Sequence, residues 1–254
     1  MTKVTSLEKG LRLVEVIAKL KSVGLRELAG ESGLPPSTVH RLLGVLAASH
    51  FLTQDAESKK YRLSFKFLEL GAVVREDLDV ISVARPHMSA LVKATSETVN
   101  LVFFDTAEVI YVDQVSNPNS LLRMFTRVGA RAPLHCTGVG KARLAVMPDE
   151  LVSEYWRSAK KQPYTVNTIT DETTLKKELK AIREIGYAVD NEEMEMGVRC
   201  SACLIRQHRA VIAGGISISG PSSRLTRDRM TSLGKLVRET ADRITTDLGY
   251  RAKE

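Results

Sequence analysis

The chain has 254 residues, enough for one large domain or two modest ones. With 43% hydrophobic and 26% charged residues it can bury a sizeable core, which excludes disorder as its main state. Its longest apolar runs, residues 101–104 and 144–147, fall far short of the ~20 residues that a membrane-spanning helix needs. A net charge of +7 permits a polyanionic partner without requiring one.

The N-terminal segment and the cysteines together favour the cytoplasm. The first residues include acidic side chains and lack the apolar region of a signal peptide. Three cysteines in a chain of this size do not make a disulfide framework, so a reducing compartment is the simpler interpretation. We therefore expect a cytoplasmic protein that does not bind a membrane.

Positive charge is denser near the N-terminus. Residues 1–76 hold 12 Lys and Arg against 8 Asp and Glu, whereas the remaining 178 residues hold 25 against 22. The two parts meet in a helix-like stretch at residues 65–76 and a short acidic break at residues 77–79. If the protein binds nucleic acid, the first part is the expected binding region.

The N-terminal part predicts three helices followed by a hairpin. A capping box, Thr5 with Glu8, opens the first helix, which continues to about residue 21. Its apolar residues at helical spacing are Leu7, Leu11, Val14 and Ala18. A second helix covers residues 25–31 and ends at Gly33, and a third runs from Pro35 and Pro36 to about residue 49. Strands at residues 51–54 and 61–64, joined by a polar turn, complete a helix-turn-helix with a wing.

The third helix has two contrasting faces when drawn at 100° per residue. Its apolar face consists of Val39, Leu42, Leu43 and Leu46. Its opposite face consists of Ser37, His40, Arg41, Gly44 and Ala48. Small and hydrogen-bonding side chains on the outer face suit a helix that enters the major groove, where Arg41 can reach guanine or phosphate. The spacing alone leaves open an ordinary amphipathic helix with a solvated face.

Beyond residue 80 the pattern is α+β. Helices are expected at residues 80–95, 139–147, 150–158, 171–185 and 226–248. Strands are expected at residues 98–105, 109–115, 121–126, 187–190, 198–206 and 211–219. Neighbouring strands without regular helical crossovers favour an antiparallel sheet covered by helices.

Short motifs follow one another in a specific order along almost the whole chain. Residues 24–29 (GLRELA) and 33–43 (GLPPSTVHRLL), followed by residues 61–63 and 68–71, resemble the winged helix-turn-helix, the wing and the linker of the IclR family of bacterial transcriptional regulators. Residues 84–86, 97–101, 131–135, 138–141, 186–187, 190–193, 197–200 and 217–221 resemble its effector domain. Pro36 departs from the family's usual basic or amide residue, and Ser201, Arg206 and Gln207 depart after Cys200.

This resemblance implies a sequence-specific DNA-binding regulator, most simply a repressor of a catabolic operon. The implied domains are a winged helix-turn-helix at residues 1–64, a linker helix at 65–79 and a GAF-like effector-binding and oligomerisation domain at 80–254. The implied partners are a double-stranded DNA operator, a small carboxylate or sugar-acid-like effector, and further copies of the chain in a homodimer or tetramer. The expected DNA-binding residues are Arg26, Ser37, Thr38, His40, Arg41, Lys59 and Lys60.

The effector site is expected where residues 135–141 lead a loop into a helix. Gly138 and Gly140 allow close approach, and amides at a helix N-terminus attract anions. On this motif alone a plain loop-to-helix junction is favoured over a ligand site. Carried over from the family, the lining is Leu121, Met124, Ala132, Gly138, Val139, Asp190, Val198, Cys200, Ser217 and Ser219. Asp190 is expected to accept from a hydroxyl or amide, because an ionised Asp would repel a carboxylate.

Catalytic and metal sites are weighed against plain structural roles. Cys200 and Cys203 form a CxxC, but they lie in a predicted strand, where positions three apart face opposite ways. His135 beside Cys136 lacks an identifiable third group. An acidic cluster, Asp190, Glu192, Glu193 and Glu195, is expected to be solvated or paired with Arg199, although a weak metal site stays open. We therefore expect no catalytic residues, no metal and no cofactor.

Two other classes of function remain as alternatives. One is an enzyme that metabolises a small acid in the C-terminal pocket, and the other is a module whose helical head binds protein. The effector, the operator, the direction of regulation and the choice between dimer and tetramer do not follow from the sequence.

Overall fold

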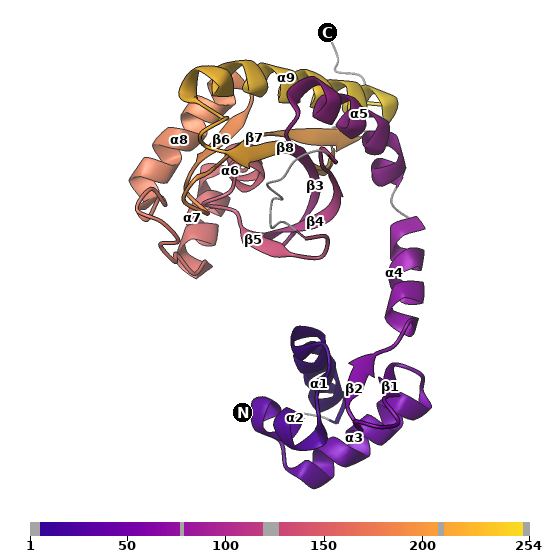
Figure 1. Cartoon of the computed structure of the whole chain (residues 1–254). Helices are drawn as coiled ribbons and strands as arrows, with labels where there is room; N and C mark the ends of the chain where they lie inside the picture. The colour runs from indigo at the N-terminus through magenta and orange to yellow at the C-terminus, as the bar shows by residue number, and fades with distance from the viewer. Residues whose placement is uncertain (1–5, 77–78, 119–126, 208–210, 251–254) are drawn as a thin grey trace. The chain divides into compact units, whose positions relative to one another are not determined.

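A computed structural model describes residues 6–76, 79–118, 127–207 and 211–250 (Figure 1). The chain divides into two compact units, Met1–Leu78 and Asp79–Glu254. Among the described residues, no helix combines the length and the apolar composition needed to cross a membrane.

Residues 6–64 of the first unit form three helices and a short hairpin. The helices are α1 (Ser6–Leu20), α2 (Leu25–Ser32) and α3 (Pro36–Ala48), and the strands are β1 (Leu52–Gln54) and β2 (Tyr61–Leu63). Their core contains Leu13, Ile17, Val23, Leu28, Val39, Leu42, Leu43, Leu52 and Tyr61. A backbone bridge between Val23 and Tyr61 joins the hairpin to the segment between α1 and α2. The predicted order of elements is therefore present, followed by α4 (Lys66–Glu76).

The turn between α2 and α3 follows from two residue types. Gly33 adopts φ of +65° and donates its N–H to Gly30 O, which ends α2 in the left-handed conformation that glycine tolerates. Pro36 occupies the first turn of α3, where its missing N–H costs no hydrogen bond.

The apolar residues whose spacing predicted α1 do not form its buried face. Leu13 and Ile17 are fully buried, whereas Leu7 is 72% and Leu11 is 55% exposed. Helix α1 carries two apolar stripes, and the packing of α2, α3 and β2 against it buries the stripe that contains Leu13 and Ile17. Thr5, the expected cap, lies outside the described residues.

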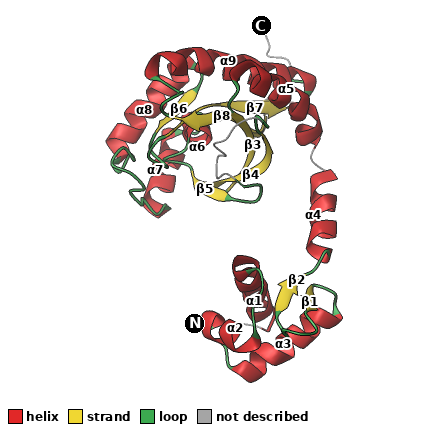
Figure 2. Ribbon diagram, in the orientation of Figure 1, coloured by secondary structure: helices red, strands yellow, loops and turns green. Residues whose placement is uncertain are grey.

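The second unit is a six-stranded antiparallel sheet with helices on both faces (Figure 2). The strand order is β5-β4-β3-β8-β7-β6. The strands are β3 (Thr98–Asp105), β4 (Glu108–Val115), β5 (Arg131–Pro133), β6 (Ala188–Asn191), β7 (Val198–Gln207) and β8 (Val211–Pro221). The helices are α5 (Asp79–Thr95), α6 (Gly138–Ala145), α7 (Asp149–Ser158), α8 (Glu172–Ile185) and α9 (Arg227–Asp247). The predicted α+β class with an antiparallel sheet is confirmed, and the expected strand at residues 121–126 lies outside the described residues.

The two faces of the sheet carry different helices. Helices α5 and α9 pack together against one face, and α9 covers β7 and β8. Helix α6 contacts β6, β7 and β8 from the other face, with α8 behind it. On that face α6, α7 and α8 share a core with alternate residues of β7, namely Cys200, Ala202 and Leu204. The start of α6 thereby faces the middle of the sheet.

Candidate functional site

The outer face of α3 is accessible and its inner face is buried. Ser37, His40, Arg41, Gly44 and Ala48 are exposed and Thr38 is half-buried, whereas Val39, Leu42 and Leu43 pack into the core. An exposed helix face with one cation and short side chains fits the width of a major groove.

Val45 was missed among the candidates. It is 56% exposed on the same helix, and its place on the helical wheel, away from Val39, would have revealed it. Its methyl groups are of the apolar kind that can contact a thymine methyl group in a major groove.

The remaining predicted DNA contacts are exposed in the same unit. Arg26 is exposed on α2, and Lys59 and Lys60 are exposed in the turn between β1 and β2. Asp55 Oδ1 accepts from the N–H (2.7 Å) and the hydroxyl (2.6 Å) of Ser58, which lowers the pKa of Asp55 and closes this turn. The turn therefore holds the two lysines where they can meet a phosphate backbone.

A cavity of about 200 Å³ opens beside the start of α6 in the second unit. Of the predicted lining, Ala132, Gly138, Val139, Asp190, Val198, Cys200 and Ser219 border it. Ser217 does not line it, and Leu121 and Met124 lie outside the described residues. Further lining residues that the sequence did not indicate are Tyr111, Ala130, Arg131, Thr137, Met194 and Glu195. Of these, Thr137 has a sequence signal, since it precedes a glycine-rich helix start as an N-cap.

The start of α6 forms one wall of this cavity. Thr137 Oγ1 accepts from Gly140 N (3.2 Å) and donates to Pro133 O (2.9 Å), which caps the helix. A Cβ at Gly138 would lie 3.1 Å from Ala202 Cβ and 3.2 Å from Cys200 Sγ, so glycine keeps this wall close to the sheet. The first N–H groups of a helix have no partner within it, so this wall suits an anion.

A hydrogen-bond network holds the hydroxyl of Ser219, which borders the cavity, and that of Ser217. Asn100 Nδ2 donates to Ser219 Oγ (3.1 Å) and Ser217 Oγ (3.4 Å), and Gln114 Nε2 donates to Asn100 Oδ1 (2.9 Å). Because the serine oxygens accept from Asn100, their protons can be donated elsewhere. Ser219 can therefore donate into the cavity, while Ser217 supports the network behind it.

Asp190 is the buried acid of the cavity. Burial, followed by the charge of Glu193, raises the pKa of Asp190 to about 7. Its Oδ1 accepts from Glu193 N (2.8 Å). At neutral pH the group is therefore partly protonated, and a protonated Asp190 can donate to a carboxylate as well as accept from a hydroxyl.

Two other acids of the predicted cluster, Glu193 and Glu192, have specific partners. Lys141 is fully buried and donates to Glu193 Oε1 (2.5 Å) and Glu178 Oε1 (3.2 Å). Glu192 pairs with Arg199 at 2.9 Å, as the structural interpretation of the cluster expects. In the part of the chain that the structure describes, no group of three or more His, Cys, Asp or Glu side chains could hold a metal ion.

The three thiols do not form a reactive centre. Cys200 and Cys203 lie on opposite faces of β7: Cys200 borders the cavity, and Cys203 Sγ donates to Gly186 O. Cys136 Sγ lies 3.6 Å from Met194 Sδ, while His135 instead contacts Tyr155 OH (3.2 Å). Burial raises the thiol pKa values to about 12 for Cys136 and Cys200 and about 11 for Cys203. All three thus remain neutral thiols near pH 7.

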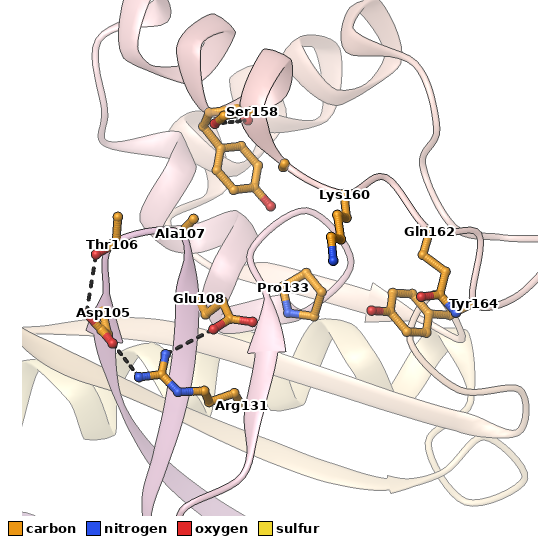
Figure 3. Close-up of a pocket in the computed structure, with 12 residues that line it drawn as sticks. Asp105, Thr106, Ala107, Glu108, Arg131, Pro133, Ser158, Lys160, Gln162 and Tyr164 are labelled. Atoms are coloured by element: carbon orange, nitrogen blue, oxygen red, sulfur yellow. Dashed lines mark hydrogen bonds and ion pairs between the residues drawn. The ribbon is translucent and has the colours of Figure 1, made fainter. Parts of the chain in front are cut away.

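A larger cavity of about 490 Å³ lies along the outer side of β5 (Figure 3). Arg131 crosses its floor and pairs with Asp105 and with Glu108 (2.9 Å). Lys160 points into it between Pro133 and Tyr164. Arg131 and the two acids already pair with one another, and no described residue that lines this cavity belongs to the first turn of a helix. The smaller cavity, which the start of α6 borders, is therefore the candidate that we retain for an anionic ligand.

Comparisons with known proteins identify the family of both units. Residues 6–56 match the family described as IclR helix-turn-helix domain, and residues 72–246 match Bacterial transcriptional regulator IclR C-terminal. The chain is 38% identical to the HTH-type transcriptional repressor AllR of Escherichia coli strain K12, over 97% of this chain and 91% of that protein.

Two solved structures show the same architecture. The Thermotoga maritima IclR is 32% identical over 96% of this chain and 99% of its own, with a TM-score of 0.79. An IclR homologue from Microbacterium hydrocarbonoxydans, solved in complex with 4-hydroxybenzoate, is 24% identical over 96% of this chain and 99% of its own, with a TM-score of 0.83. The second likeness concerns the fold alone.

Proposed function

Because this chain belongs to the IclR family of bacterial transcriptional regulators, we propose that it represses a catabolic operon under the control of a small carboxylate effector. The family resemblance of its motifs is thereby confirmed. The members of this family are DNA-binding regulators and not enzymes, so the small-acid-metabolising alternative is not retained.

The observation that carries the proposal is the presence, in one chain, of an exposed helix suited to a major groove and a cavity suited to a small acid. Arg26, Ser37, Thr38, His40, Arg41, Lys59 and Lys60 are the proposed DNA contacts, and all are accessible or half-buried in the first unit. Arg41 supplies the strongest base or phosphate contact of α3, and the wing lysines supply salt-dependent affinity.

The cavity supports an effector of small size and acidic character. Its volume of about 200 Å³ admits a small organic acid, an aromatic acid or a sugar-acid-like metabolite. The amides at the start of α6, the Ser219 hydroxyl and a protonated Asp190 can all donate to a carboxylate. The homologue that holds 4-hydroxybenzoate supplies an aromatic carboxylate as a first compound to test.

We assign DNA binding to residues 1–64, a linker helix to residues 65–79 and effector binding to residues 80–254, as the sequence predicts. We infer a homodimer or tetramer acting in the cytoplasm, because one winged helix makes too few contacts for strong operator affinity. The effector can change DNA affinity only if it binds the DNA-binding state of the protein and the released state with different affinities. The difference between those affinities limits the size of the change.

Selection of genomic fragments by the purified protein, with excess competitor DNA, tests the repressor function directly. We expect enrichment of a few sites that share a near-palindrome. Uniform recovery that only falls with added salt would mean charge-driven binding and would overturn sequence-specific regulation.

Replacing Arg41 with alanine is expected to weaken operator binding at each half-site by about 1–3 kcal/mol, because a base or phosphate contact is lost. Effector binding should be unchanged, since Arg41 lies in the other unit. Fluorescence anisotropy with a selected site measures the first effect and calorimetry the second. Arg157→Ala, which removes an exposed arginine from the second unit, is the matched control. Equal loss of both activities in Arg41→Ala would contradict the assignment of the two sites.

Filling the cavity is expected to remove the response to effector without removing DNA binding. Val198→Trp places an indole against a cavity of about 200 Å³, so a small carboxylate should bind at least tenfold more weakly. Val211→Trp makes the same change at an exposed valine that does not line the cavity. Release of the selected DNA site by the effector should be lost in the first variant and kept in the second. Unchanged release by Val198→Trp would place the effector elsewhere.

A further inference from the structure

The buried acids beside the effector cavity outnumber the buried base. Asp190 and Glu193 are each 5% exposed, and the cation between the acids and α8 is the fully buried Lys141. Glu178, the second partner of Lys141, is more exposed. With every group ionised, the two buried acids and Lys141 would carry a net charge of −1. A buried unpaired charge is costly, and uptake of a proton removes it.

The hydrogen bonds show that Lys141 pairs with only one of the two oxygens of the Glu193 carboxylate. Lys141 Nζ and Asn191 N both donate to Glu193 Oε1, while Glu193 Oε2 is buried without a hydrogen-bond partner in the described part of the chain. Glu193 N in turn donates to Asp190 Oδ1, which joins the two acids through one backbone group. We call Asp190 and Glu193 the acid pair.

The other titratable groups around Asp190 do not supply a second positive charge, so one of the two carboxylates, Asp190 or Glu193, is left without a cation. The groups that face it or line the same cavity are Lys141, Glu178, Glu193, Glu195, Cys136, Cys200, Tyr111 and Arg131. The Cys136 and Cys200 thiols and the Tyr111 phenol are neutral, because burial raises their pKa values. Arg131 is held by Asp105 and Glu108 on the outer side of β5. An incoming carboxylate would therefore meet an uncompensated negative charge.

We propose that a carboxylate effector enters this cavity together with one proton, which the acid pair takes up and Asp190 presents to the ligand. This inference rests on the effector site proposed above. The proton converts Asp190 from an acceptor that repels a carboxylate into a donor that binds it. The site thereby selects a monocarboxylate in its ionised form over a neutral isostere.

The pH range of this effect is set by the acid that holds the proton. In the free protein the pKa of Asp190 is raised to about 7 by burial and by Glu193. Below that pH the proton is already bound, so effector affinity should be constant. Above it the proton must be taken up, so affinity should fall, approaching tenfold per pH unit.

Isothermal titration with a panel of monocarboxylates, beginning with 4-hydroxybenzoate, tests this at pH 6 to 8.5. Buffers of different ionisation enthalpy give the number of protons taken up, which we expect to approach one at pH 8. The amide of the same acid, 4-hydroxybenzamide, is the neutral isostere: it should bind more weakly than the carboxylate at pH 6, and without the uptake of a proton at pH 8. Binding of the carboxylate with constant affinity and no proton uptake would overturn the inference while leaving the effector site intact.

Two isosteric variants assign the proton. Asp190→Asn should bind the carboxylate with little dependence on pH, because its amide donates without titrating. Glu193→Gln should move the midpoint to lower pH, since the charge that raises the pKa of Asp190 is gone. An unchanged pH profile in both variants would exclude the acid pair. Failure of every carboxylate to bind at pH 6, by a wild-type protein that still selects its DNA site, would overturn the effector class and this inference with it.

Discussion

Replacing Lys141 with methionine is expected to destabilise the second unit by about 3–5 kcal/mol near neutral pH, the largest single loss that we predict. The side chain is fully buried and lies between Glu178 and Glu193. Removing one partner of a buried ion pair leaves the other charge without compensation, which costs more than the pair itself contributes. Here it also leaves Asp190 and Glu193 buried side by side without a cation.

The loss should grow as pH rises from 5.5 to 8. Without Lys141 the Glu193 pKa, already raised by burial, rises further above its unfolded value. When the pKa of an acid is higher in the folded than in the unfolded protein, the folded protein becomes less stable as pH rises toward the folded pKa. The reason is that the unfolded state releases its proton at a lower pH. Protonation of Glu193 at low pH therefore removes part of the cost of burying an unpaired carboxylate in the variant.

Urea unfolding followed by tryptophan fluorescence measures this effect in the correct unit. The single tryptophan of the chain, Trp156, is buried in the second unit. Lys176→Met is the matched control, because Lys176 is partly exposed and pairs with Glu172 on the surface of α8, where such a pair contributes at most about 1 kcal/mol. Equal losses for the two variants would show that Lys141 contributes only as a surface charge does.

Gly140→Ala is expected to destabilise the same unit by about 3 kcal/mol or more. An added Cβ would lie 2.3 Å from Leu134 O and 2.4 Å from Leu134 Cα, so the start of α6 would have to move away from the backbone that precedes it. The Thr137 cap, 2.5 Å from the new atom, would be displaced as well. Effector binding should fail with it, since this helix start is a wall of the cavity.

Gly138→Ala is the graded comparison for this prediction. Its added Cβ would lie 3.1 Å from Ala202 Cβ, 3.2 Å from Cys200 Sγ and 3.6 Å from Asp190 N, so its neighbours need to shift by only a few tenths of an ångström. We expect a loss of about 1 kcal/mol for this variant, with the same unfolding assay. If Gly140→Ala unfolds at the same urea concentration as the wild type, the close approach of α6 to Leu134 is wrong.

The local elements could be predicted because their signals are local. Gly33 at the end of α2, Pro36 at the start of α3 and the alternation along β7 each follow from the backbone preferences of nearby residues. The faces of α3 followed from its period for the same reason. On α1 the period was not sufficient, since two apolar stripes run along that helix and only the packing of α2, α3 and β2 selects the buried one.

What the sequence determined by itself was the order of elements, the α+β class with an antiparallel sheet, and the family to which the motifs belong. What only the tertiary structure decided was how distant polar groups meet beside the cavity. Asn100 reaches Ser219 across 119 positions, and Lys141 reaches Glu193 across 52. No local pattern encodes such pairs, because they depend on which strands become neighbours and on how closely α6 approaches the sheet. The charge state of Asp190 follows from that burial, and a residue type alone does not determine it.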